Sequence, residues 1–154
     1  MLVFDTSALI NGWRIHYPPG TMPSVWRAIE QAIDAGQIIL PREVYLELEA
    51  KDDELLAWAK ARRRLFNDPS DEVQQQVGPI AAMFPRRGIH DRADPWVIAE
   101  AKVRGFVVVT YEGTNAATGQ PTRGAETKMP GICKQLGIDC CIVPAGLTRL
   151  GIVI

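Results

Sequence analysis

The stretch 94-DPWVIAEAKVRGFVVVTYE-112 defines the architecture of this chain. It begins inside a segment that we expect to be helical, His90–Arg104, and Gly105 marks the end of that helix. The run Phe106–Thr110 that follows is apolar and rich in β-branched residues, which is typical of a strand covered on both faces. A helix leading into a doubly covered strand predicts an α/β fold.

The same alternation extends on both sides of this stretch. Strands that alternate with helices predict a mostly parallel central sheet with helices on both faces, a three-layer sandwich. A length of 154 residues predicts a single domain over residues 1–154. The expected strands are Leu2–Asp5, Ile38–Leu40, Phe106–Thr110 and Ile138–Val143. The expected helices are Met22–Ala35, one opened by Pro41, one from Asp52 to Arg64, one from Asp68 that Gly78-Pro79 interrupts, His90–Arg104 and Ile132–Leu136, with a long loop over Gly113–Lys128.

Composition excludes several classes of protein. The 47% hydrophobic content is enough for a core. The sequence has no run of about 18 apolar residues, so we expect no membrane span. The N-terminus lacks the basic region of a signal peptide, so we expect a cytoplasmic protein. A net charge of −1 gives no global nucleic-acid signature. The three cysteines lack CxxC spacing and are expected to be small buried hydrophobes.

Four acidic residues stand out because of their positions. Asp5 closes an apolar strand, Glu112 follows another, and Asp94 precedes a proline at the head of a helix. Glu47 lies inside the short helix after Leu40 and reaches the same place only if that helix leans over the sheet edge. Because ligand sites of such sheets lie outside the carboxyl ends of the strands, these acids are candidates for one site. Taken singly, Asp94 also fits a helix cap, Glu47 a surface position and Glu112 a turn.

Clustered carboxylates need a partner, because two of them about 4 Å apart repel by roughly 4 kcal/mol at an effective dielectric near 20. Oxygen ligands without nearby Cys or His favour Mg²⁺ or Mn²⁺. The chemistry that suits such an ion is phosphodiester hydrolysis. Thr6, Ser7 and Thr110 could hold water or orient a carboxylate, although turn and cap roles fit them equally.

The order of these motifs resembles that of the PIN-domain nucleases. The resemblance spans residues 1–112 and rests on Phe4–Ile10, Pro41–Leu48, Asp94–Ala99 and Val107–Glu112. Further segments look like an uncharacterised bacterial PIN-like subfamily, and these are Tyr17–Pro19, Trp26, Lys128–Cys133 and Leu136–Ile138.

The resemblance implies a Mg²⁺- or Mn²⁺-dependent endoribonuclease, often the VapC-like toxin of a type II toxin–antitoxin pair. Such toxins are typically homodimers neutralised by a small antitoxin. By motif position, Asp5, Glu47 and Asp94 match the metal-binding acids. Glu112 stands where the family usually has Asp, so it is expected to bind through water or to assist, and Asp91 could supply a further acid. Glu43 and Glu49 replace Glu47 if the register of that helix differs.

Basic and aromatic residues suggest how partners bind. We expect arginines in the middle of the chain to guide an RNA backbone toward the acids, namely Arg62, Arg63, Arg64, Arg86 and Arg87, with Arg92 nearby. Helix faces around Trp13, Trp26 or Trp58 could support a dimer or an antitoxin contact, although core packing is the commoner role of Trp.

Other functions fit less well. Haloacid-dehalogenase-type phosphatases need a second Asp two residues after the first, where this chain has Ser7. Receiver domains place a phosphorylatable Asp at the end of a central strand, whereas Ile38–Leu40 ends in Pro41. The remaining alternative is a PIN-like module that binds RNA or protein without turnover, which the long loop and Glu112 leave open.

Overall fold

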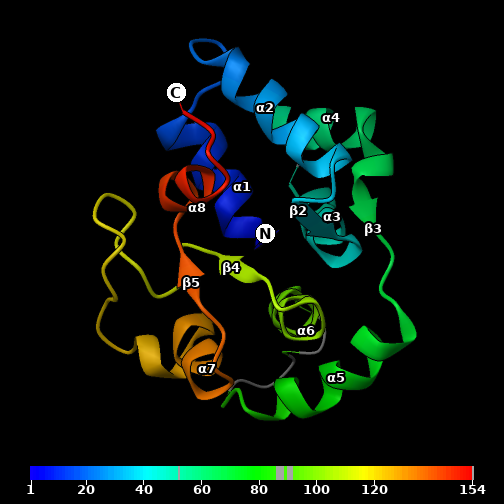
Figure 1. Ribbon diagram of the computed structural model, residues 1–154, viewed down its shortest axis with the longest axis vertical. Helices are drawn as coiled ribbons and strands as arrows, with labels where there is room; N and C mark the ends of the chain where they lie inside the picture. Colours follow the sequence, from blue (N-terminus) through cyan, green and yellow to red (C-terminus); the bar gives the residue numbers. More distant parts are fainter. Residues whose placement is uncertain (52, 86–88, 90–91, 154) are drawn as a thin grey trace.

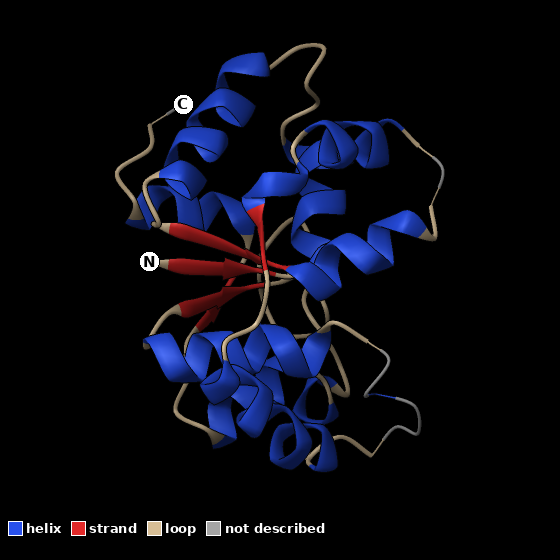
Figure 2. Ribbon diagram, turned by 90° about the vertical axis from the view of Figure 1, so that its right-hand side faces the viewer, coloured by secondary structure: helices blue, strands red, loops and turns tan. Residues whose placement is uncertain are grey.

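The computed structural model of the chain describes residues 1–51, 53–85, 89 and 92–153. Within them, five parallel strands form a sheet in the order β3-β2-β1-β4-β5. Helices α1, α2, α4 and α8 cover one face of this sheet, and α5, α6 and α7 cover the other (Figures 1 and 2). The predicted three-layer α/β sandwich is confirmed, and the sheet is parallel throughout.

The strands are short, and four of them lie where the apolar runs predicted them, whereas β3 was not predicted. All residues of β1 are buried, as are Val108 and Val109 of β4, because helices cover both faces of the central strands. The strands are β1 (Leu2–Phe4), β2 (Ile38–Pro41), β3 (Phe66–Asn67), β4 (Val107–Val109) and β5 (Cys140–Cys141).

The helices include one long pair that packs together beneath the sheet, α5 and α6. The helices are α1 (Thr6–Asn11), which continues as a π-helical turn over Gly12–His16, α2 (Pro23–Asp34), α3 (Arg42–Glu49), α4 (Glu54–Ala61), α5 (Asp71–Ala82), α6 (Asp94–Arg104), α7 (Met129–Gln135) and α8 (Val143–Arg149). No helix in the described part of the chain is long and apolar enough to cross a membrane.

Several other elements differ from the sequence prediction, among them α1 and α8, which were not predicted. Helix α5 starts at Asp71, because Ser70 caps it, and it runs through Pro79 without the predicted interruption. The helix survives because Val77, Ile80 and Ala81 are buried around the proline, so packing offsets the lost backbone hydrogen bond. The last strand is shorter than predicted, because α8 already begins at Val143.

The strand order places a switch point beside β1. The chain runs from β1 outward through β2 to β3, then returns past β1 to form β4 and β5 on the other side. Connections therefore leave the carboxyl ends of β1 and β4 in opposite directions, which opens a crevice there. The backbone N–H of Asp5 donates to the carbonyl oxygen of Val109 at 2.9 Å, so the ends of the two strands are joined directly above this crevice.

The aromatic residues considered for a dimer contact pack mainly against one another. Ring centroids of Trp13, Trp26 and Trp58 lie 4.8 to 6.0 Å apart, and Trp26 and Trp58 are buried. Core packing accounts for this cluster. Cys133 is buried as predicted, and Cys140 and Cys141 are half-buried free thiols.

Candidate metal centre

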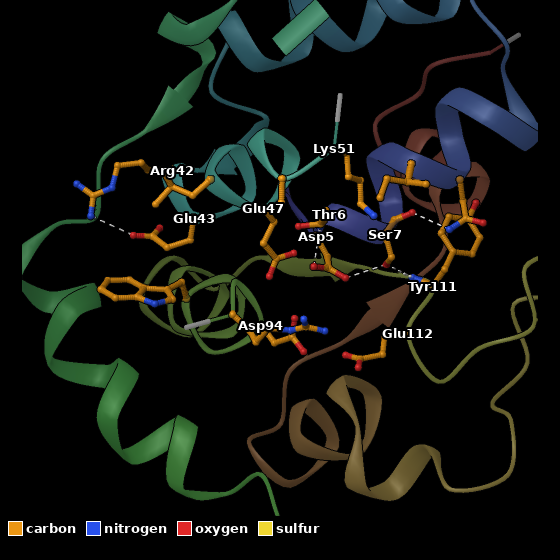
Figure 3. A pocket seen from close by; sticks show the side chains of 16 residues that line it. Asp5, Thr6, Ser7, Arg42, Glu43, Glu47, Lys51, Asp94, Tyr111 and Glu112 are labelled. Atoms are coloured by element: carbon orange, nitrogen blue, oxygen red, sulfur yellow. Dashed lines mark hydrogen bonds and ion pairs between the residues drawn. The ribbon is translucent and has the colours of Figure 1, made fainter. Parts of the chain in front are cut away.

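A pocket of about 920 Å³ opens at the carboxyl ends of β1, β2 and β4. All four acids singled out in the sequence line it, and their side chains surround a common space (Figure 3). They come from distant parts of the chain: Asp5 follows β1, Glu47 lies on α3, Asp94 begins α6, and Glu112 follows β4. The switch point of the sheet therefore gathers the acids, as the strand-end positions predicted.

Asp5 is the most rigidly held of the four. It is 3% exposed, and its Oδ1 accepts the backbone N–H of Thr6 at 2.7 Å. Its Oδ2 accepts hydrogen bonds from the Ser7 hydroxyl at 2.8 Å and the Thr110 hydroxyl at 2.9 Å. Burial, and secondly the charge of Asp94, raises the pKa of Asp5 to about 6, while the two hydroxyl hydrogen bonds oppose this rise.

Ser7 and Thr110 do more than bind Asp5. The Ser7 hydroxyl oxygen accepts the backbone N–H of Tyr111 at 2.9 Å, and the Thr110 hydroxyl oxygen accepts that of Glu112 at 3.0 Å. The two hydroxyls therefore connect the ends of β1 and β4 and fix the backbone that carries Glu112. The supporting roles predicted for them have a structural basis. The third predicted support, Thr6, lines the pocket with a buried hydroxyl that has no partner among the described residues.

Asp94 is the first residue of α6 and does not cap it. The capping position is Ala93, so the Asp94 carboxylate remains directed at the pocket, where it is 8% exposed. Burial, and then the neighbouring charges of Glu112 and Glu47, raise the pKa of Asp94 to about 7, while Arg92 lowers it. A hydrogen bond with the Glu112 side chain also contributes to this raised pKa of Asp94, so the two carboxyls are neighbours in the pocket.

Glu47 reaches the pocket because α3 lies across the sheet edge. Its Oε1 accepts the backbone N–H of Ala93 at 2.6 Å, so one oxygen fixes α3 to the start of α6. Its charge raises the pKa of both Asp5 and Asp94. The predicted register thus brings Glu47 to the pocket. Of the alternatives, Glu43 also lines the pocket, where one oxygen pairs with Arg42 at 3.1 Å and Oε2 is buried without a partner among the described residues, whereas Glu49 is exposed outside it.

Glu112 contributes an oxygen that lacks a donor. Its Oε2 is buried and has no hydrogen-bond partner among the described residues. A buried carboxylate oxygen without a partner is unfavourable, and a cation in the pocket would offset this cost. The longer Glu side chain thus still reaches the acid cluster, beside Asp94.

The chain matches the family described as Domain of unknown function (DUF4411) over residues 2–152. It belongs to this family. No curated protein matches the chain. The four acids and the hydroxyls that support them all fall within the matched DUF4411 region.

The donor set of this DUF4411 domain fits a hydrated Mg²⁺ or Mn²⁺. In the part of the chain that the structure describes, no group of three or more His, Cys, Asp or Glu side chains is already arranged to hold an ion. Mg²⁺ needs no such cage, because it keeps several waters and commonly uses one or two carboxylates. The buried acids Asp5 and Asp94, with raised pKa values, and the unpartnered Glu112 oxygen supply the charge that such an ion would offset.

The predicted RNA-guiding arginines lie outside the pocket where they are described. Arg62 pairs with Glu30 and Arg64 pairs with Asp34, both at 2.6 Å, and Arg63 packs over the ring of Tyr45. None of the three lines the pocket of the DUF4411 domain. Arg86, Arg87 and the additional acid candidate Asp91 are outside the described residues.

The cations that line the pocket are Arg42, Lys51 and Arg92. Sequence reasoning missed Arg42 and Lys51 as site residues and treated Arg92 only as part of the arginine group. A usable signal was present for Lys51, because it lies four residues after Glu47, about one helical turn further on. Lys51 points into the pocket in Figure 3. Neither it nor Arg92 forms an ion pair with a described residue, whereas Arg42 pairs with Glu43 and Asp68.

Proposed function

We propose that this chain is a metal-dependent endoribonuclease that hydrolyses RNA phosphodiester bonds with Mg²⁺ or Mn²⁺. One observation carries the proposal: five carboxylates line a pocket at the switch point of a parallel sheet, and the four that the sequence singled out come from four separate parts of the chain. Two of them are buried with raised pKa values, so the cluster is electrostatically unfavourable without a cation. Folding stability alone gives no reason to keep such a cluster.

The residues of the pocket would have different roles in metal binding and substrate binding. A bound ion would activate water and polarise a phosphoryl oxygen. Asp5 and Asp94 would hold that ion, because the three hydrogen bonds to Asp5 and the start of α6 behind Asp94 fix both carboxylates. Glu47 would bind the ion through water, since one of its oxygens already accepts a backbone N–H. Glu112 would also bind through water. Lys51 would attract the phosphate backbone that the acids repel.

The identity of the polymer and the biological role rest on the resemblance to PIN-domain nucleases. RNA as substrate, a cytoplasmic toxin of a type II toxin–antitoxin pair, a small antitoxin partner and a homodimer are all proposals on this basis. The three-layer fold and the convergence of Asp5, Glu47 and Asp94 are compatible with it.

The test is cleavage of a labelled RNA by the purified protein with Mn²⁺ or Mg²⁺. We expect cleavage that EDTA stops, and a loss of more than about 100-fold in Asp5→Asn and Asp94→Asn, since even residues behind metal ligands are worth 10–100-fold. Glu49→Gln is the matched control, because this exposed acid lies on the same helix as Glu47 but outside the pocket. Variants as active as the wild type, or a wild type inert with both ions, would refute the proposal.

A second function, binding of RNA or protein without turnover, is favoured by one finding. The described acids do not form a ready-made group of three metal ligands, and Glu47 is partly committed to the backbone. This alternative predicts RNA or protein binding by the wild type with no cleavage product at any metal concentration.

A further inference from the structure

Trp96 differs from the three other tryptophans of the chain. Trp13, Trp26 and Trp58 pack against one another in edge-to-face and tilted arrangements, and the indole N–H groups of Trp26 and Trp58 donate hydrogen bonds at 2.7 and 3.0 Å. Trp96 forms neither an aromatic pair nor an indole hydrogen bond with any described residue. It is half-buried and lines the acid pocket. The side chain packs partly against the core and also borders the pocket, so a ligand in the pocket would contact it.

Leu46 adds a second apolar side chain to the same pocket. It is 51% exposed, which is unusual for a leucine beside a folded core, and it comes from α3 while Trp96 comes from α6. Each lies close to a pocket acid in the sequence: Leu46 directly precedes Glu47, and Trp96 comes two residues after Asp94. A metal ion and a phosphodiester have no apolar part that would need this surface. A ligand that fits the whole pocket must also carry a flat or apolar group.

The charges of the pocket indicate what that ligand is. Three cations, Arg42, Lys51 and Arg92, line the same cavity as the acids, and two of them have no ion pair with a described residue. A polynucleotide combines the three required features, because it has phosphates for the cations and the metal and a flat base for the aromatic ring. A volume of about 920 Å³ exceeds what a lone phosphate group fills.

We propose that Trp96, supported by Leu46, is a nucleobase-stacking platform that positions the substrate beside the acids. The assignment rests on the proposed function in taking a polynucleotide as the ligand. The base on Trp96 must be unpaired, because the faces of paired bases are covered by their neighbours in a helix. Trp96 is thus a positioning residue for binding and has no part in the chemical step.

The test compares intact and abasic oligonucleotides. Each protein carries Asp5→Asn and is kept in EDTA, so that the bound strand is not cut and one repelling carboxylate is removed. The probe is a fluorescein-labelled RNA of about ten nucleotides, within the usual site size of single-strand binders. A matched probe has the same phosphates but abasic sugars. Binding is measured by anisotropy for the parent, Trp96→Leu, Trp96→Phe and Ile15→Ala, which removes an exposed apolar side chain outside the pocket.

We expect Trp96→Leu to weaken binding of the intact RNA by about tenfold, the lower range of base–aromatic stacking, and to leave the abasic RNA unchanged. Trp96→Phe retains a ring and should lose less, and Ile15→Ala should lose nothing. Equal losses for both probes would overturn the stacking role, because they would show that Trp96 supports the pocket itself. A parent that binds neither probe would overturn it too, and so would a Trp96→Leu variant that binds both probes as tightly as the parent does. If Trp96→Leu weakens binding of the intact RNA alone and the wild type cleaves no RNA, the nuclease proposal is refuted and the base-stacking role of Trp96 stands.

Discussion

Replacing Asp5 by Asn should stabilise the metal-free protein at neutral and basic pH. In the folded chain the pKa of Asp5 rises from 3.8 to about 6, chiefly through burial. A carboxyl with a raised pKa favours folding below its unfolded value, and this contribution is lost as pH rises through the folded value. Above about pH 7 the charged Asp5 therefore destabilises the fold. At 1.36 kcal/mol for each unit of pKa, the rise from 3.8 to about 6 corresponds to about 3 kcal/mol.

The stability gained by the Asn variant should be at most this value of about 3 kcal/mol. The amide oxygen can still accept the Thr6 N–H, and the amide nitrogen can donate to the hydroxyls of Ser7 and Thr110, which would have to reorient. We expect Asp5→Asn to gain about 1–3 kcal/mol at pH 8 and nothing at pH 4, where the wild-type carboxyl is protonated in the folded state.

The assay is urea unfolding in EDTA, followed by tryptophan fluorescence at pH 4 and pH 8. Asp139→Asn is the matched control, because this carboxyl is 72% exposed and should change stability by less than about 0.5 kcal/mol. Adding Mn²⁺ at pH 8 should reverse the order, since the ion binds the folded wild type and not the variant. An Asp5→Asn variant that is less stable than the wild type at pH 8 without metal would refute the reasoning, because Asp5 would then be a structural acid.

Two further changes separate structural from substrate-binding roles. Glu47→Ala should lose about 1–2 kcal/mol of stability in urea, because it removes the acceptor for an N–H at the start of α6. Glu47→Gln keeps that acceptor and should lose only activity. Equal stability of the two variants would show that this hydrogen bond contributes nothing to folding. Lys51→Gln should weaken RNA binding and lower the slope of log affinity against log salt by about 1. Arg64→Gln, outside the pocket, should change neither quantity. An unchanged salt slope in Lys51→Gln would show that Lys51 does not contact a phosphate.

The positions of the strand-end acids were predictable because few rules determine them. Apolar runs fix the strands, and parallel strands bring their carboxyl ends to one edge, so Asp5 and Glu112 had to lie near each other. Glu47 was less certain, since its place depends on how α3 crosses the sheet edge. The hydrogen bond from the Ala93 N–H to Glu47 partly fixes that geometry, and it joins residues 46 positions apart, which no local sequence pattern encodes.

Charge clusters in the sequence were a poor guide to the cations of the pocket. Arg62, Arg63 and Arg64 are adjacent in the chain, yet each is held by a partner from a distant segment, and none reaches the site. Lys51 has no basic neighbour in sequence and still lines the pocket, because the end of α3 leads into it. Tertiary contacts hold the three arginines away from the site, and the path of the chain after α3 brings Lys51 to it; spacing along the sequence reveals neither.

The most direct test of the metal centre is a titration of the protein with Mn²⁺ at pH 8, with free ion followed by electron paramagnetic resonance. We expect saturable binding by the wild type that weakens as pH falls toward 6, because protons then compete for Asp5 and Asp94. Asp94→Asn should lose at least about tenfold in affinity. A wild type without saturable Mn²⁺ binding, or an Asp94→Asn variant that binds as tightly, would contradict the metal centre.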